Sequence, residues 1–160
     1  MGTTDNNIID LELDLSPIRK KSIRIDGDDN RILYLNTSDM NIVARMNDLY
    51  PKLKELAEDT TKELPKSDDV EKEFADMAEY FTSIDKRMRE VMDELFDGNV
   101  SEICAPSGNM YDIINGGFRY EFIMDSLLKL YSDNIEKETK KVQKRIQSHT
   151  DKYTKGGKRK

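Results

Sequence analysis

The sequence has no tryptophan, one cysteine and one histidine, and its mean hydropathy is −0.77. A single cysteine, Cys104, cannot form an internal disulfide, which fits a reducing cytoplasm. No apolar run approaches the ~18 residues needed to cross a bilayer, and the acidic N-terminus does not suit a secretory signal. Hydrophobic and charged residues each make up 36% of the 160 residues. This balance predicts one solvated, helical domain with a thin core.

A catalytic constellation is also missing. The only histidine, His149, lies in a basic tail, and no Lys or Arg lies close to Cys104 in sequence to activate its thiol. The acidic pairs occupy polar helix faces, without an apolar pocket that would perturb them. The acidic turn from Asp26 to Asn30 lacks the remaining ligands of a calcium loop. We therefore expect a non-enzymatic protein without a metal or cofactor.

Positive charge is scarce in most of the chain and concentrated at its end. Residues 137–160 hold ten Lys or Arg against Glu138 and Asp151, a net charge of +8. The preceding 136 residues hold 16 positive and 30 negative charges, a net charge of −14. The tail could bind nucleic acid, but the acidic body and the lack of an aromatic platform or recognition helix argue against that role. A solvated tail, or one that docks on an acidic protein surface, fits better.

The central feature is an apolar stripe with alternating steps of four and three residues. This spacing predicts an amphipathic helix over Asp69–Asp97, roughly 42 Å long, which needs partner helices to cover it. Asp68 and Glu71 form a candidate capping box at its start. The stripe is either the core of this protein, which is the simpler interpretation, or a groove for a foreign helix. Its members are Val70, Phe74, Met77, Phe81, Ile84, Met88, Val91 and Leu95, widened by Met92 and Phe96.

The segment before this helix predicts β-structure and one shorter helix. Residues 1–20 form an N-terminal arm, in which Ile8–Leu15 alternates apolar and acidic residues, as in a strand or a strand-like docking arm. Ser22–Asp26 and Arg31–Asn36 predict a β-hairpin around Gly27–Asn30.

The first helix follows this hairpin. Thr37 or Ser38 should cap it, and Pro51 should kink it near Leu49. A polar linker, residues 57–67, separates it from the central helix.

The segment after the central helix predicts a third helix and the tail. We expect this helix to begin near Met110, with Ser107 as its N-cap, and to be broken at Gly116–Gly117 before it continues to Ile135. The last five residues, 156–160, are expected to be disordered. The fold class is therefore mainly α (α+β): an N-terminal hairpin with an arm and three principal helices. Its parts are 1–20, 21–135 and a basic helical or disordered tail, 136–160.

Three stretches resemble a family of small proteins from tailed phages and prophages of Gram-positive bacteria. They are SIRIDGDDNRILYLNTSDMNIVARMNDLYPKL, the helix end IDKRMREVMDELFDGNVSEICAP, and FRYEFIMDSLLKLY. The resemblance covers roughly residues 20–135. Members of that family are tail assembly chaperones, encoded between the major tail protein and the tape measure protein. The N-terminal arm and the basic C-terminus depart from the family pattern.

The resemblance implies a chaperone that binds the tape measure protein and helps to recruit the major tail tube protein. It would act in the host cytoplasm and be absent from the mature virion, with self-association left open. Binding would use an amphipathic surface in which flexible methionines adapt to the partner. The candidate partner-binding residues are Phe74, Met77, Phe81, Met88, Met92, Phe118 and Phe122. The alternatives are a virion structural, head-tail or tail completion protein, and a small helical nucleic-acid-binding regulator that acts through the basic tail.

Overall fold

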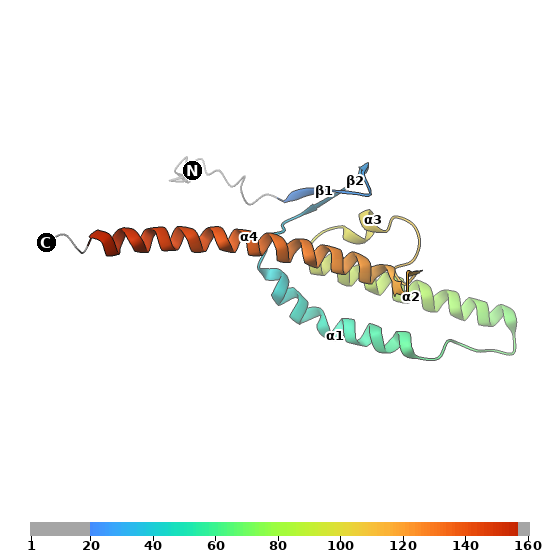
Figure 1. The fold of residues 1–160 in the computed structure, drawn as a ribbon. Coiled ribbons are helices and arrows are strands. Elements are labelled where there is room, and N and C mark those ends of the chain that lie inside the picture. Colours follow the sequence, from blue (N-terminus) through green and yellow to red (C-terminus); the bar gives the residue numbers. More distant parts are fainter. Residues whose placement is uncertain (1–19, 157–160) are drawn as a thin grey trace, which may run out of the picture.

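The computed structural model describes residues 20–156 (Figure 1). It confirms the expected fold class, because the described chain is mainly helical and begins with a two-stranded hairpin. The predicted strand-like segment Ile8–Leu15 and the last four residues lie outside the described part. The elements are β1 (Lys21–Ile25), β2 (Asp28–Leu35), α1 (Asn41–Thr61), α2 (Val70–Phe96), α3 (Val100–Cys104), β3 (Ile113–Ile114), β4 (Gly117–Phe118) and α4 (Arg119–Gly156).

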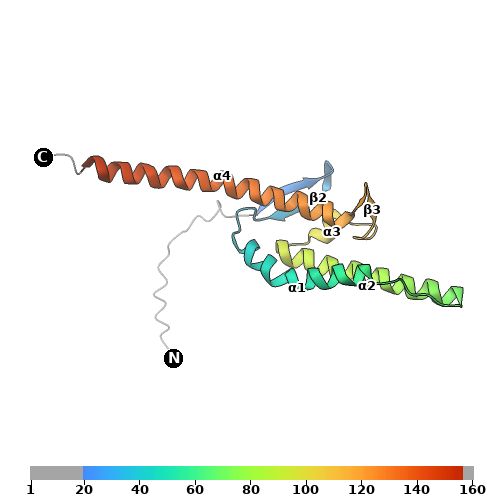
Figure 2. The ribbon, with the colours of Figure 1, turned by 60° about the horizontal axis from the view of Figure 1, so that its bottom comes forward.

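The molecule is elongated, and its two ends are formed by different helices. α1 and α2 form an antiparallel pair, and the first half of α4 lies against the second half of α2 (Figures 1 and 2). The N-terminal half of α2 projects at one end of the molecule, and the C-terminal half of α4 projects at the opposite end. The hairpin and α3 lie between these ends, so the core is confined to the middle of the molecule.

The predicted hairpin is present, but its turn lies at Asp26 and Gly27 rather than over Gly27–Asn30, and Asp28–Asn30 belong to β2. Asp26 and Gly27 both have left-handed backbone angles, with φ of 53° and 69°. This is the backbone of the two-residue turn that an Asp-Gly pair favours between antiparallel strands. Leu33 on β2 is fully buried. Arg31 donates hydrogen bonds of 3.0 Å to the carbonyls of Ile103 and Cys104, which joins the hairpin to α3.

The helix starts differ from the predicted caps. Neither Thr37 nor Ser38 caps α1; instead the Asn41 backbone N–H donates to the Asp39 carboxylate at 2.9 Å. Burial raises the pKa of Asp39, but the hydrogen bonds from Asn41 and Arg45 outweigh this effect and leave the pKa below its ordinary value. Pro51 lies inside α1, which remains one helix but changes direction along its length (Figure 1).

At the start of α2, the cap is one residue later than predicted. The Asp69 carboxylate accepts a hydrogen bond from the Glu71 backbone N–H at 3.1 Å, and the proposed capping box of Asp68 and Glu71 is wrong. Glu71 and Glu73 place negative charge in the first turn, where the helix dipole favours it. The predicted span of Asp69–Asp97 agrees with α2 to within one residue at each end.

The core forms where the apolar stripes of α1, α2 and α4 meet the buried face of β2. It includes residues from every one of these elements and from the segment around α3. Its fully buried large side chains are Leu33, Leu35, Leu49, Leu56, Met88, Met92, Leu95, Phe96, Val100 and Met110.

Charged residues of α2 hold the segment after α3 in place. Arg89 donates to the carbonyls of Ala105 (2.9 Å) and Gly108 (3.0 Å), and its Nε donates to Asp85 at 2.9 Å. Asp85 also accepts the Met110 backbone N–H at 2.7 Å. One helical turn after Arg89, Asp93 accepts both the backbone N–H and the hydroxyl of Ser101 at 2.8 Å. In the sequence these side chains looked like solvated charges on a polar face, and no local signal distinguished them.

The expected helix from Met110 to Gly116 is wrong. β3 and β4 form a minimal hairpin there, with Asn115 and Gly116 at φ of 49° and 80° in its turn. The glycine pair therefore marks a β-turn rather than a break within a helix, because left-handed angles end helical hydrogen bonding. α4 then runs unbroken from Arg119 to Gly156. The predicted boundary at residue 135 is thus not a change of secondary structure but the point beyond which α4 is exposed.

Candidate protein-binding surfaces

The apolar stripe of α2 is divided into a buried half and an uncovered half. From Ile84 to Phe96 every apolar member is buried. Toward the N-terminus, Phe81 is 39% exposed, Phe74 68% and Val70 63%, while Met77 is half-buried. We call Val70, Phe74, Met77 and Phe81 the uncovered stripe.

The coverage of α2 stops at Tyr80 and Phe81 for a geometric reason. The Tyr80 hydroxyl donates to the Asp59 carbonyl at 2.9 Å, two residues before α1 ends. On the other side, the Asn109 side chain donates to the Phe81 carbonyl at 3.2 Å, where the segment after α3 turns back. α2 has 27 residues, so its length of roughly 40 Å exceeds the reach of both partners. Its first three turns consequently project past them.

Acidic side chains surround the uncovered stripe. Between Asp68 and Glu79 the chain has six acidic residues and one lysine, Lys72. Most of these carboxylates are exposed. An apolar stripe with this rim suits a partner that is apolar along one face and positively charged along its edges.

The structure separates the seven predicted partner-binding residues into three groups. Phe74, Met77 and Phe81 belong to the uncovered stripe. Met88 and Met92 are 1% and 0% exposed and lie in the core, so they are not available to a partner. The prediction that Met88 and Met92 contact a partner is therefore wrong, because the part of the stripe on which they lie is buried in the core.

Phe118 and Phe122 form the third group and lie in different surroundings. Phe118 is half-buried in an aromatic cluster with Tyr111 and Tyr120, with ring centroids 5.3 and 5.8 Å away. Phe122 is exposed and lines a crevice of about 380 Å³ between the hairpin and α4. Phe122 therefore lies in a crevice separate from the α2 stripe. Sequence spacing could not predict this position, because the direction of α4 is set by the turn at Gly116.

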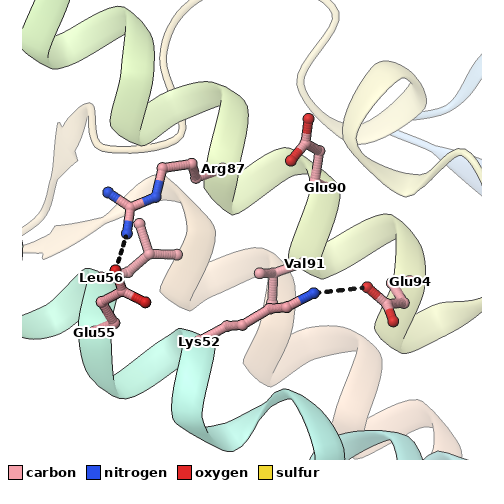
Figure 3. A pocket seen from close by; sticks show the side chains of 7 residues that line it. All are labelled: Lys52, Glu55, Leu56, Arg87, Glu90, Val91 and Glu94. Atoms are coloured by element: carbon pink, nitrogen blue, oxygen red, sulfur yellow. Dashed lines mark ion pairs between the residues drawn. The ribbon is translucent and has the colours of Figure 1, made fainter.

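A second crevice, of about 340 Å³, lies between α1 and α2 (Figure 3). Lys52 pairs with Glu94 at 3.5 Å, and Arg87 pairs with Glu55 at 3.4 Å, across a floor formed by Leu56 and Val91. These ion pairs bridge the two helices at the surface and close the groove between them. The crevice holds no arrangement of nucleophile and base.

Arg87 also joins α2 to the last turn of α1. Its guanidinium lies 2.8 Å from Asp59, and Lys62 lies 2.8 Å from the same carboxylate. Hydrogen bonds from Lys62 and Arg87 hold the pKa of Asp59 below its ordinary value, so this carboxylate stays ionised and does not act as a proton donor. The cluster is a structural clamp at the border of the uncovered stripe.

The cysteine is chemically quiet. Burial raises the pKa of Cys104 to about 11, more than the nearby Arg31 lowers it. Its thiol is therefore protonated near neutral pH, in agreement with the prediction that the thiol is not activated. Within residues 20–156 no three His, Cys, Asp or Glu side chains are grouped to hold a metal ion. No described helix is long and apolar enough to cross a membrane.

Comparison of the chain with protein-family models, curated proteins and solved structures finds no match. The resemblance to tail assembly chaperones thus rests on the sequence stretches quoted above. The geometry of the uncovered stripe is an independent observation about the same chain.

Proposed function

We propose that this protein binds an apolar helical segment of another protein along the uncovered stripe of α2 and keeps that segment from aggregating. The family resemblance names the client as the tape measure protein, with the major tail tube protein as a second partner. In this role the protein acts in the host cytoplasm as a tail assembly chaperone and leaves before the particle is complete. It uses no catalytic residue and no cofactor.

The observation that carries the proposal is the exposure of Val70 and Phe74 on a helix whose stripe is buried in the core from Ile84 onward. A solvent-facing phenylalanine and valine on one stripe expose apolar area that a partner helix can cover, at ~25 cal/mol per Å² of area removed from water. The acidic rim keeps the free protein from associating through this area and favours a client with basic edges. Of the central methionines, only Met77 remains available to adapt to the client.

The test is co-expression with a tape measure protein in bacteria, followed by measurement of the soluble fraction of the tape measure protein. The intact chain should keep the client in the supernatant, where the client alone forms aggregates. The double variant Val70→Asp, Phe74→Asp should lose this effect, because both substitutions place charge on the uncovered stripe without entering the core.

A matched control is Val43→Asp, since Val43 is 67% exposed on the first turn of α1, away from the uncovered stripe. It should protect the client as well as the intact chain does, and circular dichroism should show unchanged helicity for all variants. Equal protection by the double variant and the intact chain would refute the binding surface. A client that stays insoluble with the intact chain would refute the chaperone role.

Purified particles distinguish the chaperone from a virion component. The chaperone should be absent from them, whereas a structural, head-tail or tail completion protein would be present in stoichiometric amounts.

A further inference from the structure

The C-terminal half of α4 carries a second apolar stripe that no other described element covers. Val142, Ile146 and Tyr153 are 44%, 57% and 82% exposed. Together with His149 they lie within an arc of about 60° on the helix surface, at ~100° per residue. The arc continues the face by which the first half of α4 contacts the core, because Ile135, seven residues before Val142, packs against the core. We call Val142, Ile146, His149 and Tyr153 the tail stripe.

The tail stripe has the same spacing as the uncovered stripe of α2. In both, successive members are separated by four, three and four residues. Each stripe is therefore about three helical turns, or ~16 Å, long. Alternating steps of four and three residues are typical of helices that pack side by side, with the side chains of one helix filling spaces on the other. The two stripes thus match each other in length and in period.

The charges around the two stripes are opposite. Between residues 137 and 156 the helix holds seven Lys or Arg and two acidic residues, a net charge of +5. Between Asp68 and Glu79 the chain holds six acidic residues and one lysine, a net charge of −5. Arg145 and Lys152 border the tail stripe on the helix surface, and Glu73 borders the uncovered stripe. Two uncovered stripes therefore repel each other, as do two tail stripes, whereas one tail stripe attracts one uncovered stripe.

The two stripes of one molecule lie too far apart to meet. The uncovered stripe is at one end of the elongated molecule and the tail stripe is at the opposite end (Figures 1 and 2). In both views α2 and α4 run in the same direction. A second copy displaced along the long axis therefore brings its uncovered stripe to the tail stripe of the first copy, with the two helices parallel as they are within each copy.

We propose that the tail stripe of one copy packs on the uncovered stripe of a second copy, so that the molecules associate head to tail. The contact joins two different surfaces, so a pair keeps one free stripe at each end and a third copy can add to it. About three helical turns on each side bury less than the ~1,200–2,000 Å² of stable interfaces, so the association is weak and depends on concentration. Since the client is proposed to bind the same stripe of α2, client binding and the addition of a second copy exclude each other.

The test is sedimentation velocity of the full chain over a series of concentrations. At low salt the weight-average mass should rise above the monomer mass of 18.6 kDa, and it should fall back at high salt because salt screens the attraction. Phe74→Asp and Ile146→Asp should each remain monomeric, because each variant has lost one of the two stripes. An equal mixture of these variants should form a dimer and nothing larger, because one intact tail stripe and one intact uncovered stripe can still meet.

Two matched controls place the same charge outside both stripes. Val43→Asp changes an exposed residue of α1, and Gln147→Asp changes an exposed residue of α4 next to the tail stripe member Ile146 in sequence but on another face of the helix. Both controls should associate as the intact chain does. Circular dichroism should show unchanged helicity for all four variants, so that a loss of association reports on the contact and not on folding.

The other outcomes overturn the proposal. An intact chain that stays monomeric at ~1 mM does not form the contact, and binding of a short DNA duplex by that chain would assign the tail to nucleic acid instead. Association of Phe74→Asp alone would mean that tail stripes pair with each other, and association of Ile146→Asp alone would mean that uncovered stripes do. A mixture that stays monomeric while the intact chain associates would also overturn it. These measurements use the protein alone, so their result is independent of the client and of the proposed chaperone role.

Discussion

Alanine substitution along the α2 stripe should give a gradient of stability that residue size alone would not produce. Met88 is 1% exposed in the core, Phe81 is 39% exposed at the limit of coverage, and Phe74 is 68% exposed beyond it. All three occupy equivalent positions in the repeating spacing of one helix. If the stripe were uniformly buried, alanine substitution of the two phenylalanines would lower the free energy of unfolding more than substitution of Met88.

The magnitudes follow from burial. Met88→Ala removes a fully buried side chain and leaves a cavity, at a cost of about 2–5 kcal/mol. Phe74→Ala loses only the covered minority of a side chain whose full burial stabilises by ~1.5–3 kcal/mol, so the cost is below about 1 kcal/mol. Phe81→Ala should fall between them, at about 1–2 kcal/mol.

Urea unfolding followed by circular dichroism measures these differences. The midpoint should fall most for Met88→Ala and least for Phe74→Ala, with unchanged m-values as evidence that only stability has changed. A thermal melt should agree, because 1 kcal/mol corresponds to about 2–4 °C in a chain of this size. A loss for Phe74→Ala equal to that for Met88→Ala would mean that the uncovered stripe is covered in solution, and the binding surface would have to be abandoned.

Two further predictions concern the polar contacts. Arg89→Met should destabilise the protein by about 2–3 kcal/mol in urea unfolding, because the carbonyls of Ala105 and Gly108 lose a charged hydrogen-bond donor. Arg89→Lys should recover little of this stability, since an ammonium lacks the planar guanidinium geometry that reaches both carbonyls. Asp39 has a lowered folded-state pKa, so its ionised form stabilises the protein above the unfolded pKa of about 3.8, and this stabilisation is lost as the pH falls through the folded value. The difference in unfolding free energy between the intact chain and Asp39→Asn should therefore be full at pH 7 and shrink below about pH 4, and a pH-independent difference would contradict the assignment.

Local patterns determined the elements whose signals lie within a few residues. The run of turn-forming residues over Gly27–Asn30, between two strand-like segments, predicted the hairpin, but the turn itself lies at Asp26 and Gly27. The regular spacing from Val70 to Leu95 predicted α2 to within one residue, since the period of the helix is itself local. The fold class followed from these two features and from composition.

Only the tertiary structure decided which part of the α2 stripe is core and which part is surface. Spacing assigned Phe74 and Met88 to the same face with equal weight, but burial depends on where α1 ends and where the segment after α3 turns back. The path of the segment after α3 is set by the hydrogen bonds of Arg89 and Asp85 with backbone groups far along the chain. No sequence pattern predicts these hydrogen bonds. The sequence left the tail after residue 135 as either helical or disordered, and the structure shows one helix through Gly156, whose first half is anchored in the core.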